Sequence, residues 1–222
     1  MKTPDLPLLL SLFCGIMCFA QKIPIPANYT IVDSVSGDLD KDNIPEIAVV
    51  YNTRTTDGYD NILRELIIYK VKDGKWVAWK NSLQALYGSD DGGMMGDPYG
   101  SIEIQNGVLS ISQNGGSGWK WGHTDKYRYQ DGNFYLIGYI DGYGRMCVEW
   151  TTVDFNLSTG KLVVEKEYQS CDDTDDEMKV LKTENETMYK KGLKITLEKR
   201  SEKEIKIVTP KYKFDIYVAT KG

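Results

Sequence analysis

Apolar and polar residues alternate along most of this chain in short runs separated by turn residues, the pattern of paired β-strands. Strand-like runs at 63–71 and 76–79 flank the pair Asp73 and Gly74. Glycine accepts the positive φ of a tight hairpin turn, so this pair predicts a hairpin. The same arrangement recurs near Gly107 and Gly132. We therefore expect an antiparallel all-β meander of hairpins with about ten to twelve strands.

The pattern leaves the arrangement of the sheet open between a sandwich, an open barrel and a partial propeller-like form. Helical periodicity is rare, and we expect at most one or two short helices, at 81–87 and 175–182. Two glycine-rich stretches, 88–100 and 114–118, are expected to be surface loops. Because no clear boundary divides the rest of the chain, we expect residues 21–222 to form a single β-rich domain.

Residues 1–20 follow a different pattern. A short positive start precedes the apolar run LLLSLFCGIMCFA, which ends at Ala20 before polar residues. This run is too short to span a bilayer and is typical of a cleaved signal peptide, so we expect a secreted or periplasmic protein. Cys14 and Cys18 are not preceded by a small residue, and we therefore do not expect a lipid anchor. We expect no membrane span elsewhere in the chain.

Composition and cysteine count further narrow the class of protein. The formal net charge of −5 argues against nucleic-acid binding, which needs a basic surface. Cys147 and Cys171 are the cysteines that remain after the signal. An exported chain with one such pair most simply forms one disulfide, and two separate buried thiols are the alternative.

One loop carries specific metal chemistry, the stretch GDLDKDNIPEIAVV that begins at Gly37. Hard divalent cations take six to eight oxygen ligands, and a loop supplies them best from alternate residues. If Asp38 is the first ligand, Asn43 occupies the sixth position, where the chain must turn with positive φ. The ligand set predicted by this spacing, with Ile44 acting through its backbone carbonyl, is Asp38, Asp40, Asp42, Ile44 and Glu46.

This loop resembles the calcium loop of FG-GAP and VCBS-type repeats, which occur in integrin α-chain propellers and secreted bacterial proteins. The stretch is also similar to openings of uncharacterised secreted Bacteroidetes-type proteins. The resemblance implies Ca²⁺ as the bound ion. This chain has Asn43 where the family usually has Gly and Glu46 where Asp is commoner, and it has one copy of the loop, so the propeller is not implied. The alternative is a solvated acidic turn without an ion.

If calcium binds, we expect a structural role, in which the ion ties the predicted strand at 29–36 to the one at 47–51. A second stretch, GGSGWKWGH, places aromatic residues beside a flexible loop. Aromatic rings can stack on sugars or peptides, so we expect a ligand-binding surface there; core packing is the alternative. Its candidate residues are Trp119, Trp121, His123 and Tyr127.

Catalytic motifs are weak in this sequence. Ser117, His123 and Asp125 could form a hydrolase triad, but no nucleophile elbow accompanies them. Glu103 and Glu149 could serve as paired carboxylates for glycoside cleavage. We therefore expect a non-enzymatic, calcium-stabilised module that binds a glycan or a protein. The alternative is a secreted hydrolase that acts on a polysaccharide or peptide.

Overall fold

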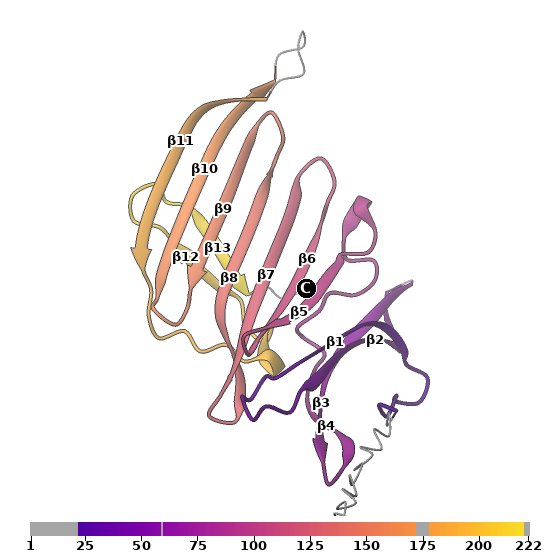
Figure 1. The fold of residues 1–222 in the computed structure, drawn as a ribbon. Coiled ribbons are helices and arrows are strands. Elements are labelled where there is room, and N and C mark those ends of the chain that lie inside the picture. Colours follow the sequence, from indigo (N-terminus) through magenta and orange to yellow (C-terminus); the bar gives the residue numbers. More distant parts are fainter. Residues whose placement is uncertain (1–21, 59, 172–177, 220–222) are drawn as a thin grey trace, which may run out of the picture.

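The computed structural model describes residues 22–58, 60–171 and 178–219 and shows an all-β protein built from three antiparallel sheets (Figure 1). The predicted hairpin meander is confirmed, with thirteen strands in the described ranges. Within these ranges the sheets remain open, with no closed barrel. The predicted signal peptide at 1–20, with its two cysteines, lies outside the described residues. No helix in the described ranges is long and apolar enough to cross a membrane.

Two sheets follow the chain in order. The smaller sheet contains β1 (Thr30–Gly37), β2 (Glu46–Asp57), β3 (Asn61–Lys72) and β4 (Lys75–Ser82). The long sheet contains β5 (Tyr99–Gln105), β6 (Val108–Gly116), β7 (Lys120–Gln130), β8 (Asn133–Arg145), β9 (Glu149–Asn156), β10 (Lys161–Cys171) and β11 (Met178–Tyr189). The third sheet is the hairpin of β12 (Ile205–Val208) and β13 (Asp215–Ala219). Two short 3₁₀ helices complete the fold, η1 (Gly93–Met95) and η2 (Leu197–Lys199).

Three hairpins turn through two-residue loops that the sequence predicted. Both residues of each loop have positive φ, the conformation of a type I′ turn, whose twist matches that of the flanking strands. These loops are Asp73–Gly74, Asn106–Gly107 and Asp131–Gly132. Their local chemistry therefore sets where β3, β5 and β7 end and where the next strand begins.

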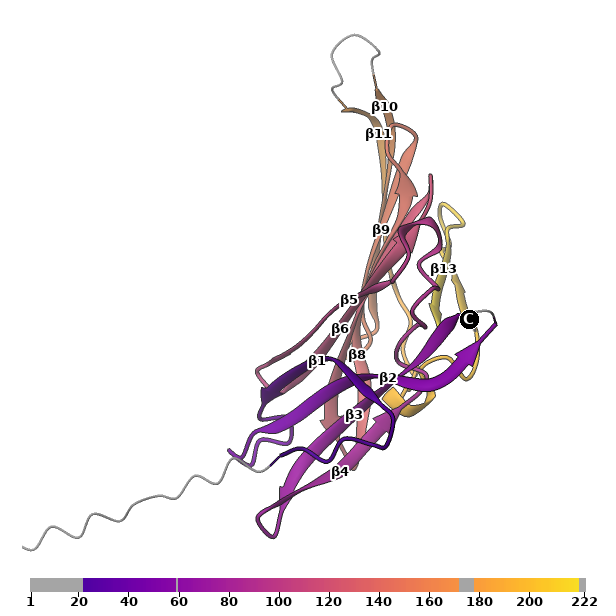
Figure 2. The same ribbon diagram turned by 90° about the vertical axis from the view of Figure 1, so that its right-hand side faces the viewer.

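The core lies on one face of the long sheet, which we call the inner face. Figure 2 shows the long sheet edge on, with β13 beside one of its faces. One continuous buried cluster joins this face, through residues such as Leu109 and Phe155, to Val50 of the smaller sheet and to Val218 of β13. The smaller sheet also buries its other face, where Tyr51 and other residues form a second cluster. The ends of β10 and β11 extend beyond these layers (Figure 2).

Both predicted helices are wrong. Residues 81–82 end β4, and the Ser82 hydroxyl then accepts the N–H groups of Gln84 and Ala85 at 3.1 Å, which holds a turn. The same hydroxyl donates to the Leu197 carbonyl at 2.7 Å, so tertiary contact selects the turn. Of the second predicted helix, residues 178–182 belong to β11, because pairing with β10 satisfies their backbone groups; 175–177 lie outside the described residues.

Other segments also differ from expectation. Residues 193–197 alternate apolar and polar residues as a strand does, but they make one isolated bridge, through Thr196, before η2 begins. The expected loop at 114–118 begins inside β6, and the segment before β5 lies against this strand. Gly116 N–H donates to the Gly92 carbonyl at 2.8 Å, and Asn114 N–H donates to the Pro98 carbonyl at 2.9 Å. Glycine here permits close backbone packing as well as turning.

Candidate functional site

The acidic loop joins β1 to β2, which pair antiparallel up to Gly37 and Glu46. Carboxylate oxygens of Asp38, Asp40 and Asp42 lie within 4.8 Å of one another. Asn43 has a φ of 66°, the left-handed conformation predicted for the sixth position of the loop. The backbone therefore has the predicted turn, and it brings three of the five predicted ligands together.

Backbone hydrogen bonds hold the loop in this shape. The Asp38 carboxylate accepts the N–H groups of Lys41 at 2.6 Å and Asn43 at 3.0 Å. The Asp42 carboxylate accepts the Ile44 N–H at 2.7 Å. These bonds bend the chain around its own carboxylates, and they leave further oxygen lone pairs free, since a carboxylate has about four acceptor sites.

The two remaining carboxylates have different surroundings. Asp40 Oδ2 lies 3.3 Å from Lys70 Nζ, whereas its Oδ1 is buried and lacks a hydrogen-bond partner among the described residues. Glu46 is 1% exposed, and its Oε2 accepts the Leu39 N–H at 2.7 Å. Burial raises the pKa of Glu46, although the bond from Leu39 opposes this effect. An oxygen-rich triad with an unsatisfied oxygen fits a hard cation; ligation by Glu46 and by the Ile44 carbonyl stays a prediction.

A pocket of about 330 Å³ lies on the inner face, between strands β7–β9 and strand β13. Strand pairing places His123 of β7 opposite Asp141 of β8, and Asp141 opposite Val153 of β9. One row further along, Trp121 pairs with Tyr143. The aromatic side chains that line the pocket are Tyr87, Trp121, His123, Tyr139, Tyr143 and Tyr217.

A bulge in β8 decides which side chains enter this pocket. Tyr127 pairs with Leu136, but Lys126 pairs with Gly138, so Ile137 is an extra residue on β8. A shift of one residue moves every later side chain of a strand to the opposite face. Because of this bulge, Asp141 faces the pocket beside His123.

Close packing of β6 against β7 positions the Trp121 ring. A Cβ placed on Gly115 would lie 2.6 Å from Trp121 Cζ2 and 2.8 Å from the Gly92 Cα, so only glycine fits without displacing the ring. Trp121 and His123 stack with centroids 5.9 Å apart, and the Tyr87 ring meets Trp121 at 5.3 Å. The pocket wall is therefore built of rings that support one another.

A buried ion pair closes one side of the pocket. Arg200, just after η2, donates to Asp125 through Nε at 2.5 Å and through Nη2 at 3.1 Å. The Tyr127 hydroxyl donates to the same carboxylate at 3.0 Å. Burial disfavours the charge of Arg200, but the Asp125 carboxylate, together with Tyr127 and Tyr139, outweighs burial and raises the pKa of the guanidinium. The pair therefore fastens the C-terminal segment to β7.

Asp141 has no such partner. It forms no ion pair within the described residues, and burial raises its pKa to about 6, against the effects of the Tyr139 hydroxyl and Arg200. His123 is likewise partly buried, and this desolvation lowers its pKa. A carboxylate desolvated among aromatic rings, with its pKa moved toward neutrality, is a common feature of functional sites.

The predicted ligand-binding residues have separate positions. Trp121 and His123 line the pocket, and Trp119 stacks on Tyr143, with ring centroids 5.4 Å apart at an interplanar angle of 15°. Tyr127 is fully buried in the core, so the prediction that it contacts a ligand is corrected. Alternation along β7 continues from the pocket into the core, which is why Tyr127 shares a face with Trp121 yet is covered.

Neither predicted catalytic group is assembled. Asp125 is engaged by Arg200, so it does not serve His123 in a triad, and Ser117 lies in a turn where its N–H donates to the Trp119 carbonyl. Glu103 on β5 and Glu149 on β9 are separated by three strands, hence by about 19 Å at the usual strand spacing. Paired glycosidase carboxylates need about 5–10 Å, so this pair is excluded.

Sequence reasoning missed Tyr139, Asp141, Tyr143, Arg200 and Tyr217. The first three lie on the strand that follows the Asp131–Gly132 turn, and the hairpin alone indicates that this strand is the neighbour of β7. Arg200 and Tyr217 reach the pocket from the C-terminal segment, and no local signal marks them.

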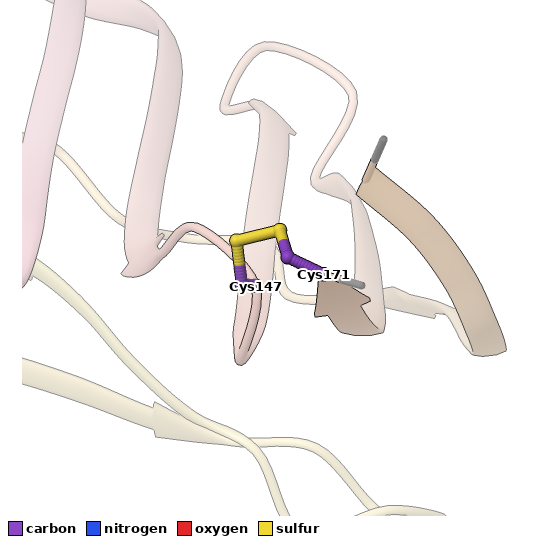
Figure 3. Close-up of a disulfide and its surroundings, with 2 residues drawn as sticks. All are labelled: Cys147 and Cys171. Atoms are coloured by element: carbon purple, nitrogen blue, oxygen red, sulfur yellow. A yellow bond between two sulfur atoms is a disulfide. The ribbon is translucent and has the colours of Figure 1, made fainter. Parts of the chain in front are cut away.

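The predicted disulfide between Cys147 and Cys171 is confirmed (Figure 3). It joins the turn between β8 and β9 to the end of β10, with the two Cα atoms 5.0 Å apart. Neither cysteine lines the pocket, so we assign the bridge a structural role at the end of the long sheet.

No known protein family matches this chain, and no curated protein is significantly similar to it. The resemblance of the acidic loop to FG-GAP and VCBS-type repeats therefore stays a prediction.

Proposed function

We propose that this protein is an exported, non-enzymatic binding domain that holds a unit of a glycan in the pocket between β7–β9 and β13. The observation that carries the proposal is the pocket of about 330 Å³, which is lined both by aromatic rings and by polar groups such as Asp141 and Thr151. Known ligand pockets span about 300–1,000 Å³, so this volume suits a small ligand or one part of a larger chain.

The placement of aromatic rings supports a sugar. Tyr143 is 49% exposed and stacks on Trp119, so the aromatic wall continues beyond the pocket. Exposed aromatic surface is costly to leave in water, and a ligand with an apolar face and polar edges covers it while it keeps its hydroxyl groups hydrogen-bonded. A pyranose ring has this character. A protein ligand that inserts a side chain is the other class of the proposal.

Calcium has a supporting role in this proposal. The acidic loop joins β1 to β2, remote in sequence from the pocket strands, so an ion there would stabilise the smaller sheet and leave ligand contact to the pocket. The triad of Asp38, Asp40 and Asp42, with the unsatisfied Asp40 Oδ1, supports Ca²⁺ binding.

Binding of neutral and charged oligosaccharides, measured by titration calorimetry, tests the glycan proposal. Trp150 offers a matched control for Trp121, because it lies on the opposite face of the long sheet, where its ring packs over Gly142 at 3.2 Å from a Cβ placed there. We expect Trp121→Ala to weaken binding at least about tenfold, or 1.4 kcal/mol, and Trp150→Ala to leave it within about twofold. Equal effects would contradict the pocket assignment, and cleavage of a bound oligosaccharide would favour the hydrolase alternative.

A further inference from the structure

The charges of the pocket do not cancel. Arg200 is neutralised by Asp125, with contacts at 2.5 and 3.1 Å. Asp215, on the opposite wall, lies 2.8 Å from Lys206 Nζ. Asp141 has no ion pair within the part of the chain that the structure describes. Among the described residues, Asp141 is therefore the pocket carboxylate without an ion pair of its own, since Arg200 already pairs with Asp125.

The groups that face Asp141 from each neighbouring element do not replace that counter-charge. On β7 its partner is His123, whose pKa is lowered by burial, so the ring is neutral near neutral pH. On β9 its partner is Val153. The Tyr139 hydroxyl donates to the Tyr217 carbonyl of β13 at 3.0 Å. Burial raises the pKa of Asp141 and outweighs Tyr139 and Arg200, which both act to lower it. A cationic group on a ligand would complete the charge balance of the described residues at this site.

The surrounding rings also favour a cation. Aromatic faces carry negative potential, and an ammonium group over such a face is stabilised by about 0.5–2 kcal/mol. Trp121 and Tyr143 face each other across the pair β7 and β8, in the row next to Asp141. The same negative potential would repel an anionic ligand, and a neutral ligand would leave the partly buried Asp141 carboxylate without an ion pair.

We propose that this pocket selects a glycan unit that carries a free, positively charged amino group, and that Asp141 receives the ammonium while the rings of Trp121 and Tyr143 contact the sugar. This inference rests on the proposed glycan-binding function and specifies its ligand. The stacked pair of Trp119 and Tyr143 continues the flat wall beyond the pocket, where a neighbouring sugar unit of the same chain would lie.

The test compares three oligosaccharides of equal length, built from glucosamine, N-acetylglucosamine or glucose, in titrations near neutral pH. The first two differ only in acetylation, which removes the charge of the amine. We expect the glucosamine oligomer to bind at least about tenfold more tightly than the other two. Asp141→Asn, which keeps the side-chain shape, should remove this preference, so that this variant binds the three oligomers within about twofold of one another. Asp215→Asn serves as the control carboxylate and should retain the preference.

Each other outcome has a distinct meaning. Equal binding of all three oligomers, unchanged by Asp141→Asn, would overturn the amine preference and leave the glycan-binding function intact. Binding of none of them would overturn both proposals. If a lysine-containing peptide binds through Asp141 more tightly than the glucosamine oligomer, the ammonium site stands and its assignment to a sugar is wrong. A melting curve of the Asp141→Asn sample used in the titration shows whether the variant is folded, and so separates loss of binding from unfolding.

Discussion

Asp125 and Asp141 lie on neighbouring strands and face the same side of the long sheet, yet their surroundings are opposite. Asp125 is 1% exposed and receives two hydrogen bonds from Arg200. Asp141 lines the pocket and has no ion pair among the described residues. Around Asp125 the chain supplies its own counter-charge, which fixes the C-terminal segment to β7. Around Asp141 the described residues supply no ion-pair partner. The comparison teaches that a charge without an ion-pair partner, more than burial itself, makes the pocket a candidate binding site.

The largest loss of stability should come from removing the ion pair between Arg200 and Asp125. Arg200→Met leaves the Asp125 carboxylate buried without its cation, and breaking a buried pair in this way destabilises a protein by about 3–5 kcal/mol. Urea unfolding measures the loss. The double variant with Asp125→Asn removes the stranded charge as well, so it should be less destabilised than Arg200→Met alone. A double variant that is as unstable as the single one would show that the stranded charge is not the cause.

Removal of the disulfide should lower stability without changing the affinity of the pocket. Replacing Cys147 and Cys171 with Ser opens a link across 24 residues, which should lower stability by about 3 kcal/mol in the chain-entropy model. Because neither cysteine lines the pocket, ligand affinity in conditions where the protein is folded should stay within about twofold. A tenfold loss of affinity would mean that the two regions are coupled.

Ionisation of Asp141 should lower the stability of the fold as pH rises, whereas ionisation of a salt-bridged carboxylate raises it. The folded-state pKa of Asp141 is raised to about 6, whereas an unfolded Asp titrates near ~3.9. Between these values the folded protein holds a proton that the unfolded chain has lost. Asp141 therefore lowers stability progressively as pH rises from about 4 to about 6, by at most about 3 kcal/mol.

Asp141→Asn cannot ionise, so the variant should be more stable than the natural chain above pH ~6 and equal to it near pH ~4. Unfolding free energies of both proteins across this range give the difference, in which the titration of His123 largely cancels because both proteins contain it. The charged groups Arg200, Asp125 and Asp215 are likewise present in both. Parallel stability profiles would show that the Asp141 charge is already compensated in the folded protein.

The smallest change in stability should come from calcium binding to the acidic loop, where carboxylates lie together outside the long sheet. Calcium at about ten times its dissociation constant should stabilise the protein by ~1.4 kcal/mol, and a chelator should reverse this. Asp40→Asn removes the negative charge of the carboxylate whose Oδ1 lacks a hydrogen-bond partner among the described residues. The variant should therefore lose most of the stabilisation by calcium. Melting temperatures with and without calcium measure both. If calcium changes the melting temperature of both proteins equally, the ion binds at another place or does not bind to this protein.

Local chemistry explains why part of this structure could be predicted. The Asp73–Gly74, Asn106–Gly107 and Asp131–Gly132 turns depend on the φ that their own residues accept, and all three were predicted. The bend at Asn43 and the pairing of Cys147 with Cys171 follow in the same way from local conformation and from cysteine count. The predicted helix at 81–87 failed because a contact with Leu197, far along the chain, competes with local preference.

The sequence by itself determined an all-β chain of hairpins, the shape of its acidic loop, its disulfide and the aromatic character of β7. Only the tertiary structure decided which of those rings meet a pocket and which are covered, because one extra residue at Ile137 sets the face on which Asp141 lies. It also decided which charge is matched, since Arg200 reaches Asp125 across 75 residues. Periodicity is a property of neighbours in the chain, whereas charge balance in a pocket depends on residues that only the folded chain brings together.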